Sequence, residues 1–335
     1  MTSSEAATAE QAGIRRLAIP TPFLVGRVNC YLIEDEPLTL IDTGPNSGKS
    51  LDELERALAA HGHRVEDLEL IILTHQHMDH VGLLEILARR SGAEVAALHS
   101  LREYLADFSS SAATDDEFAQ TIMRRHGVPE DLTTVLGSLG AAFRAFGSSG
   151  PVSRSLRDGD ELPLRDRTLR ILHRPGHSPS DTIFWDEARR MLIGGDHLLA
   201  LISSNPLISR PLGEGSDSPR PHALIRYIES LRATREMPIE IVLPGHGEAI
   251  HDHVTLIDDR LGMHDRRARK MLGMLDSGPL TAYEIALRTW GNVSVTQAYL
   301  TLSEVLGHMD LLVAEGRVME REDGHLSRFE AVREG

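Results

Sequence analysis

The chain has 335 residues and a formal net charge of −15 at pH 7. Hydrophobic residues make up 41% of it and charged residues 25%, which is ordinary for a globular protein with room for one large and one small domain. The negative charge argues against general affinity for nucleic acids, because binding to phosphates needs clustered Lys and Arg. The single cysteine, Cys30, excludes an internal disulfide, and we expect it in the core of a cytoplasmic protein.

Residues 1–13 contain neither the basic nor the apolar segment of a secretory leader, so we expect a disordered tail there. No run of 18 apolar residues occurs in the sequence, and therefore no membrane-spanning helix and no membrane partner is expected.

The next part of the chain alternates strand and helix signals, which predicts an α/β domain. We expect Ser50 and Glu53 to form a capping box at the start of the first helix, and further helices at about 80–90 and 222–235. The apolar, β-rich runs predict strands at 28–34, 38–42, 68–74, 93–99, 168–173, 182–185, 191–195 and 239–243.

Residues from about 101 to 150 interrupt this alternation, because they carry helical patterns and no strand signal. We interpret them as a helical insertion that is a candidate lid over a binding site. The apolar stripe within it is better explained by ordinary packing than by contact with a substrate, and it consists of Leu136, Leu139, Phe143 and Phe146.

The segment 42–50, DTGPNSGKS, resembles a phosphate-binding loop and an aspartic protease motif, but it lacks an essential feature of each. As a phosphate-binding loop it is one residue short between Gly44 and Gly48, and Pro45 lacks an amide that could bind phosphate. As an aspartic protease motif it would need a second copy, because two facing aspartates share the catalytic proton.

A dense group of metal-ligand residue types follows the strand predicted at 68–74. His75 and His77 alternate at the strand end, so both side chains point to one face, and Asp79 and His80 begin the next helix. Nitrogen and oxygen ligands at this spacing favour a divalent zinc site.

Three later strand ends carry one further candidate ligand each, and they are His177, Asp196 and His246. Strand ends are where ligands converge on α/β scaffolds. The chain has 17 histidines, and most of them, including those at 61, 63, 251 and 253, are interpreted as surface or capping residues.

In these motifs, together with Asp42, the sequence resembles the metallo-β-lactamase-fold hydrolase superfamily over about residues 14–250. The resemblance implies an αβ/βα sandwich, with Asp196 bridging two metal ions and Asp42 as a structural residue near the site. It assigns two sets of ligands: His75, His77 and His177 for the first metal, and Asp79, His80 and His246 for the second.

The resemblance also implies a hydrolase with two Zn²⁺ ions, although iron or manganese can occupy the same ligands. A hydroxide that bridges the metals would attack a small-molecule ester, thioester or lactone, with Asp79 as the catalytic residue that orients it. Cys30 is not needed as a nucleophile.

The C-terminal part predicts helices at 266–275, 281–289 and 297–315, followed by a hairpin around Asp323-Gly324. We therefore divide the chain into a metallo-β-lactamase-fold domain, 14–252, and a winged-helix-like domain, 253–335. From residue 255 on, ten Arg and Lys stand against thirteen Asp and Glu, which disfavours nucleic-acid binding. A packing tail that completes the active-site wall or a homodimer interface is the preferred interpretation.

Such a tail makes the chain most similar to the lactamase-beta-like branch of the superfamily. That branch includes an RNA-cutting enzyme and thioesterases that act on acyl carrier proteins. The resemblance therefore leaves a second function open, a single-strand endoribonuclease.

Overall fold

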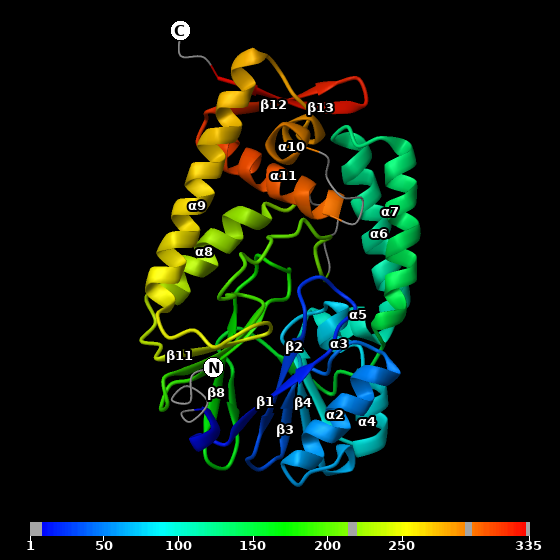
Figure 1. The fold of residues 1–335 in the computed structure, drawn as a ribbon, viewed down its shortest axis with the longest axis vertical. Coiled ribbons are helices and arrows are strands. Elements are labelled where there is room, and N and C mark those ends of the chain that lie inside the picture. The colour runs from blue at the N-terminus through cyan, green and yellow to red at the C-terminus, as the bar shows by residue number, and fades with distance from the viewer. Residues whose placement is uncertain (1–8, 214–219, 292–296, 333–335) are drawn as a thin grey trace.

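The computed structural model describes residues 9–213, 220–291 and 297–332. Its largest sheet has six strands in the order β1-β2-β3-β4-β5-β6, antiparallel from β1 to β3 and parallel from β3 to β6 (Figure 1). These strands are β1 Ile14–Ile19, β2 Val28–Ile33, β3 Thr39–Ile41, β4 Leu70–Ile72, β5 Glu94–Leu98 and β6 Arg154–Leu156.

A second sheet of five strands has the order β11-β10-β9-β8-β7, in which only β10 and β11 run parallel. Its strands are β7 Glu161–Pro163, β8 Thr168–His173, β9 Thr182–Asp186, β10 Met191–Gly195 and β11 Ile241–Pro244. The sequence did not predict β1, β6 or β7. Two of these have three residues, and β1 interrupts its apolar positions with Arg15 and Arg16, so none carries a strong strand pattern.

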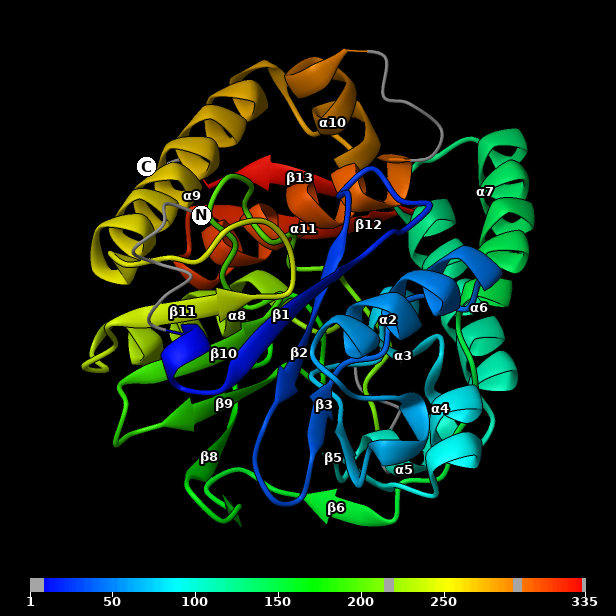
Figure 2. The ribbon, with the colours of Figure 1, turned by 60° about the horizontal axis from the view of Figure 1, so that its bottom comes forward.

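The two sheets pack face to face and share one apolar core, in which Ile33 and Ile72 of the first sheet lie with Phe184 and Ile193 of the second. Helices cover the outer faces: α2 Gly48–Ala60, α4 Leu84–Ser91 and α5 Leu101–Ala106 on the first, and α8 Ala223–Arg235 on the second (Figure 2). Cys30 lies fully buried in the outer core of the first sheet. The predicted αβ/βα sandwich is confirmed.

The predicted capping box at the start of α2 is wrong by three residues. The helix is capped by Ser47, whose hydroxyl accepts a hydrogen bond from the amide of Ser50 at 3.1 Å. Ser50 is already inside the helix, where its hydroxyl donates to the carbonyl of Pro20, and Glu53 forms an ion pair with Arg27 at 2.6 Å. Two serines three residues apart both fit a cap pattern, and the position of Pro20 decides between them.

The insertion is helical, as predicted, and continues from α5 with α6 Phe108–Arg125 and α7 Glu130–Phe143. Its end packs onto the sandwich, because the rings of Phe143 and Phe146 meet that of Phe23 edge to face at 5.7 and 5.9 Å. The other end of α6 reaches the C-terminal elements, where Ile122 and Met123 join their core (Figure 1). Phe143 and Phe146 of the apolar stripe therefore pack against the sandwich, and Leu136 packs against the C-terminal core, as expected. A lid function of the insertion stays a prediction.

Beyond the sandwich lie α9 His253–Met274, α10 Ala282–Trp290, α11 Ala298–Ala314 and the hairpin of β12 Val318–Asp323 with β13 Leu326–Ala331. The helix predicted at 266–275 begins earlier, because Asp252 caps the amide of Thr255 at 2.9 Å. The remaining short helical turns are α3 Met78–Val81 and the 3₁₀ turns Val65–Asp67, Arg144–Phe146 and Leu275–Ser277.

Three helices and a hairpin are present, as predicted, but the winged-helix likeness itself stays a prediction. Helix α11 is buried around its whole circumference from Leu302 to Asp310, and it fills the centre of the C-terminal core. The predicted tail 1–13 lies outside the described residues up to residue 8, and Ala9 is buried against the sandwich core. Among the described residues, no helix is long and apolar enough to cross a membrane.

One buried ion pair joins the two sheets. Arg167, which precedes β8, binds the carboxylate of Asp35 at 3.1 Å, and both side chains are almost fully withdrawn from water. The same guanidinium donates to the carbonyl of Ala12.

Replacing Arg167 with Ala is expected to lower the free energy of unfolding by ~3–5 kcal/mol, because the Asp35 carboxylate would stay buried without its partner. Urea unfolding followed by circular dichroism measures this change. Arg165→Ala is the matched control, since Arg165 forms exposed ion pairs whose loss costs under ~1 kcal/mol. Equal midpoints for the two variants would contradict the assignment.

Candidate metal centre

The predicted ligand residues converge at one edge of the sandwich, where the strands of both sheets end. His75 and His77 follow β4, and Asp79 and His80 lie in α3. On the second sheet, the other three residues follow β8, β10 and β11, and they are His177, Asp196 and His246. Residues separated by up to about half of the chain thus lie in one site.

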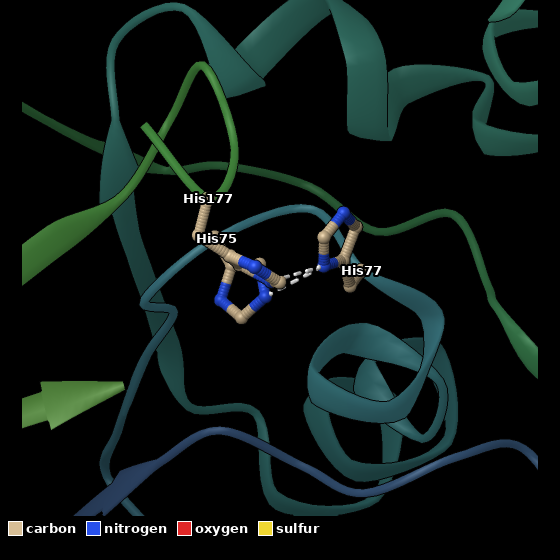
Figure 3. A group of neighbouring side chains, drawn as sticks. All are labelled: His75, His77 and His177. Carbon is tan, nitrogen blue, oxygen red and sulfur yellow. Dashed lines mark hydrogen bonds between the residues drawn. The ribbon is translucent and has the colours of Figure 1, made fainter. Parts of the chain in front are cut away.

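The first cluster consists of three imidazoles (Figure 3). His75 Nε2 lies 3.0 Å from His77 Nδ1, and His177 Nε2 lies 2.9 Å from the same His77 nitrogen. Three nitrogens that face one another so closely form a half-shell of the kind that holds a zinc ion.

The second cluster contains Asp79, His80 and His246. His246 Nε2 lies 3.3 Å from Asp79 Oδ2, and the side chains of His80 and His246 are almost completely buried. This set offers two nitrogens and a carboxylate.

Asp196 lies between the clusters and reaches both. Its Oδ2 is 3.6 Å from His177 Nε2 and 3.4 Å from His246 Nε2, and its Oδ1 is 3.5 Å from His80 Nε2. Asp196 therefore offers carboxylate oxygens to both clusters.

The ligand atoms fit a cation better than they fit one another. His80 Nε2, Asp196 Oδ1 and His246 Nε2 are buried and have no hydrogen-bond partner among the described residues. Buried polar atoms without partners are costly, and a divalent ion would satisfy all three of them at once.

Comparisons with known proteins agree with this geometry. Residues 24–246 match the family described as the metallo-beta-lactamase superfamily. The probable metallo-hydrolase YqjP of Bacillus subtilis is 33% identical over 319 residues, which is 95% of this chain and 97% of that protein. The chain belongs to the metallo-beta-lactamase superfamily. The predicted family is therefore confirmed, and with it a metal-dependent hydrolase.

Two further proteins are similar to the chain. The crystal structure of a metallo-beta-lactamase family protein from Thermus thermophilus superposes with a TM-score of 0.78 at 26% identity, covering 96% of this chain and 99% of that one. The atrochrysone carboxyl ACP thioesterase of Emericella nidulans is 23% identical over 249 residues, 74% of this chain and 60% of that protein.

Three imidazoles of the metal centre are oriented by hydrogen bonds. In each ring, the nitrogen that faces away from the centre binds a carboxylate or a backbone carbonyl, as is usual for metal-ligating histidines. Asp42 Oδ2 binds His80 Nδ1 at 2.7 Å, which directs Nε2 of that ring toward Asp196. Backbone carbonyls do the same elsewhere: His246 Nδ1 donates to Arg27 at 2.8 Å, and His177 Nδ1 donates to Asn205 at 3.0 Å.

Sequence reasoning named Asp42 as structural but missed Arg27 and Asn205, because a backbone acceptor is independent of residue type. The loop that carries Asn205 also reaches the site through Ser204, whose hydroxyl donates to the carbonyl of Asp196. A clearer signal was the glycine of LPGHGE, since a Cβ at Gly245 would lie 2.3 Å from Asp196 Oδ1.

Burial keeps the imidazoles of the first cluster neutral, which is the form that binds metals. It lowers the pKa of His75 well below the ordinary value and that of His77 to about 3, and the neighbouring imidazoles act in the same direction. Both rings are therefore neutral at pH 7, with lone pairs available to a metal.

The second cluster responds differently because carboxylates surround it. Burial disfavours the protonated imidazoles, but Asp42, Asp196 and Asp79 outweigh it and raise the pKa of His80 well above its usual range. Burial disfavours the protonated ring of His246, but the nearby carboxylates of Asp196 and Asp79 raise its pKa to about 10. A cation must displace these protons, so its affinity falls as the pH is lowered.

Asp196→Ala is expected to lose most of the metal bound at this centre, because both clusters lose a shared ligand. Elemental analysis of protein purified without added metal measures the loss. Asp115→Asn, a change in the insertion away from the ligands, is the control that should keep its metal. Full retention of metal by Asp196→Ala would refute a bridging role.

Proposed function

We propose that the chain is a dinuclear zinc hydrolase that cleaves a small-molecule ester, thioester or lactone. The observation that carries this proposal is the position of Asp196, within 3.6 Å of ligand nitrogens from both clusters. When bound, two such cations lower the pKa of water and polarise a carbonyl oxygen.

Asp79 has the position and charge of the residue that handles the proton of the attacking water. Its carboxylate lies among the ligands and is only slightly exposed. Burial alone would favour the neutral acid, but the neighbouring imidazoles of His80 and His246 lower the pKa of Asp79. An ionised carboxylate here can accept a hydrogen bond from water and hold it in line with a bound carbonyl group.

The one cysteine of the chain does not compete with water in this role. Cys30 is fully buried on β2, and burial together with Asp42 and Asp79 raises the pKa of its thiol well above the ordinary value. A protonated thiol in the core is a poor nucleophile.

A thioester is the substrate class that we favour. The fungal relative is named as an acyl-carrier-protein thioesterase, and it shares detectable similarity over 74% of this chain. The net charge of −15 is also compatible with small acyl substrates, for which no basic surface is needed.

The burial of α11 disfavours the endoribonuclease. A winged-helix protein reads nucleic acid with an exposed helix, and α11 would be that helix by its order in the chain. Its residues from Leu302 to Asp310 are all buried, so the middle of this helix has no face exposed to a nucleic-acid groove.

Zinc-loaded protein is expected to hydrolyse short acyl thioesters or lactones and to leave single-stranded RNA intact. Asp79→Asn should lower kcat by about 10²–10⁴-fold, because it removes the proton acceptor. Metal content is measured on the same samples, so that loss of zinc and loss of the proton acceptor are distinguished. Arg165→Ala is the control that should keep full activity.

RNA cleavage that depends on Asp79, without any hydrolysis of thioesters or lactones, would overturn the proposal. One iron per chain at this centre instead of two zinc ions would also overturn it, because a single iron favours oxidative chemistry over hydrolysis.

A further inference from the structure

Three metal-ligand side chains are buried together far along the chain from the ligands of the metal centre. His264 comes from α9, and Glu304 and His308 come from one face of α11, four residues apart. They are 1%, 7% and 0% exposed. A nitrogen of each histidine and a carboxylate oxygen of Glu304 lie within 4.8 Å of one another.

The backbone fixes the protonation of His308. Its Nδ1 lies 2.6 Å from the carbonyl oxygen of Glu304, which can only accept, so Nδ1 carries the proton. The neutral ring therefore presents the lone pair of Nε2, in the way that metal-ligating histidines are prepared by a backbone carbonyl.

The distance between the two rings suits coordination. His308 Nε2 lies 3.3 Å from His264 Nδ1. Two nitrogens at roughly 2.0–2.1 Å from a tetrahedral zinc ion are separated by about 3.3 Å, so the two rings could hold a cation with little movement.

Among the described residues, the two rings are hydrogen-bonded to each other through His264 Nδ1 and His308 Nε2, and the other nitrogen of His264, Nε2, is buried without a partner. Burial, His308 and nearby arginines lower the pKa of His264 to about 3, and burial lowers that of His308, so both rings are in the neutral form that binds metals.

Two arginines of α9 lie near the cluster. Arg267 of α9 forms an ion pair with the carboxylate of Glu304, and its side chain is 36% exposed. Arg260, one turn before His264 on α9, donates to the carbonyls of Leu199 and Ala200 rather than to the cluster. A cation would therefore compete with Arg267 for Glu304, and the exposed guanidinium can turn into water.

We propose that His264, Glu304 and His308 form a second metal site, which binds a divalent cation of the zinc class and links α9 to α11. Two imidazoles and one carboxylate leave one position for water. The link also reaches the metal centre indirectly, because the His264 ring packs edge to face on Tyr227, whose hydroxyl donates to the carbonyl of His197 beside Asp196. A cation at this site would therefore join α9 and α11 at a point that contacts Tyr227 of α8.

Zinc titration against a chromophoric chelator tests the site in the full-length protein. The wild type is expected to bind one zinc ion per chain more than His264→Gln and His308→Gln. His253→Gln is the matched control, since His253 is buried on the same helix but hydrogen-bonds to the carbonyl of Met237 outside the cluster. Asp196→Ala should retain this one ion. Equal zinc content in the wild type and both cluster variants would overturn the proposal.

Arg267→Gln provides a test that does not depend on replacing a buried residue. Removing the competing positive charge should tighten one zinc equivalent by about tenfold and leave the others unchanged. Unchanged or weakened binding of every equivalent would overturn the proposal.

Discussion

The fold depends on the balance between buried carboxylates and histidines at the edge of the sandwich. Asp42, Asp79 and Asp196 are withdrawn from water together with the imidazoles that surround them. Isolated buried carboxylates are very unfavourable, so each of the three is matched by a histidine, and the remaining lone pairs are arranged for cations. The strands of both sheets are needed for this, because no single segment of the chain supplies both clusters.

Hydrogen bonds between the two sheets fix their relative position next to the metal centre. Asn29 Nδ2 on β2 donates to the carbonyls of Pro244 and Gly247 at 2.9 Å, and the hydroxyl of Tyr31 donates to the same Pro244 carbonyl at 2.7 Å. These bonds attach the end of β11, and with it His246, to the first sheet. Arg167 and Asp35 make a second attachment away from the metal centre. The ligands are therefore held by rigid elements on both sides, which is what a site with a bridging carboxylate requires.

The metal ligands and the sandwich were predictable from the sequence because short motifs at strand ends carry them. His75 and His77 needed only the alternation of a strand, and His177 and His246 followed apolar runs. The rest depended on long-range geometry. The pair of Arg167 and Asp35 is separated by 132 residues, and a backbone carbonyl that orients a histidine has no residue preference. The burial of α11 was equally hidden, since Glu304 and Asp310 within it look like surface residues until Arg267 and Arg220 are placed beside them.

The contact of α6 with the C-terminal core affects how the chain must fold during synthesis. Ile122 and Met123 emerge from the ribosome well before α11 and β13, the C-terminal elements that α6 contacts. The sandwich strands can assemble while this helix still exposes its apolar end, so the nascent protein carries an uncovered patch until its last segment is released. We expect the unfinished chain to depend on chaperones over this interval more than the uninterrupted sandwich would.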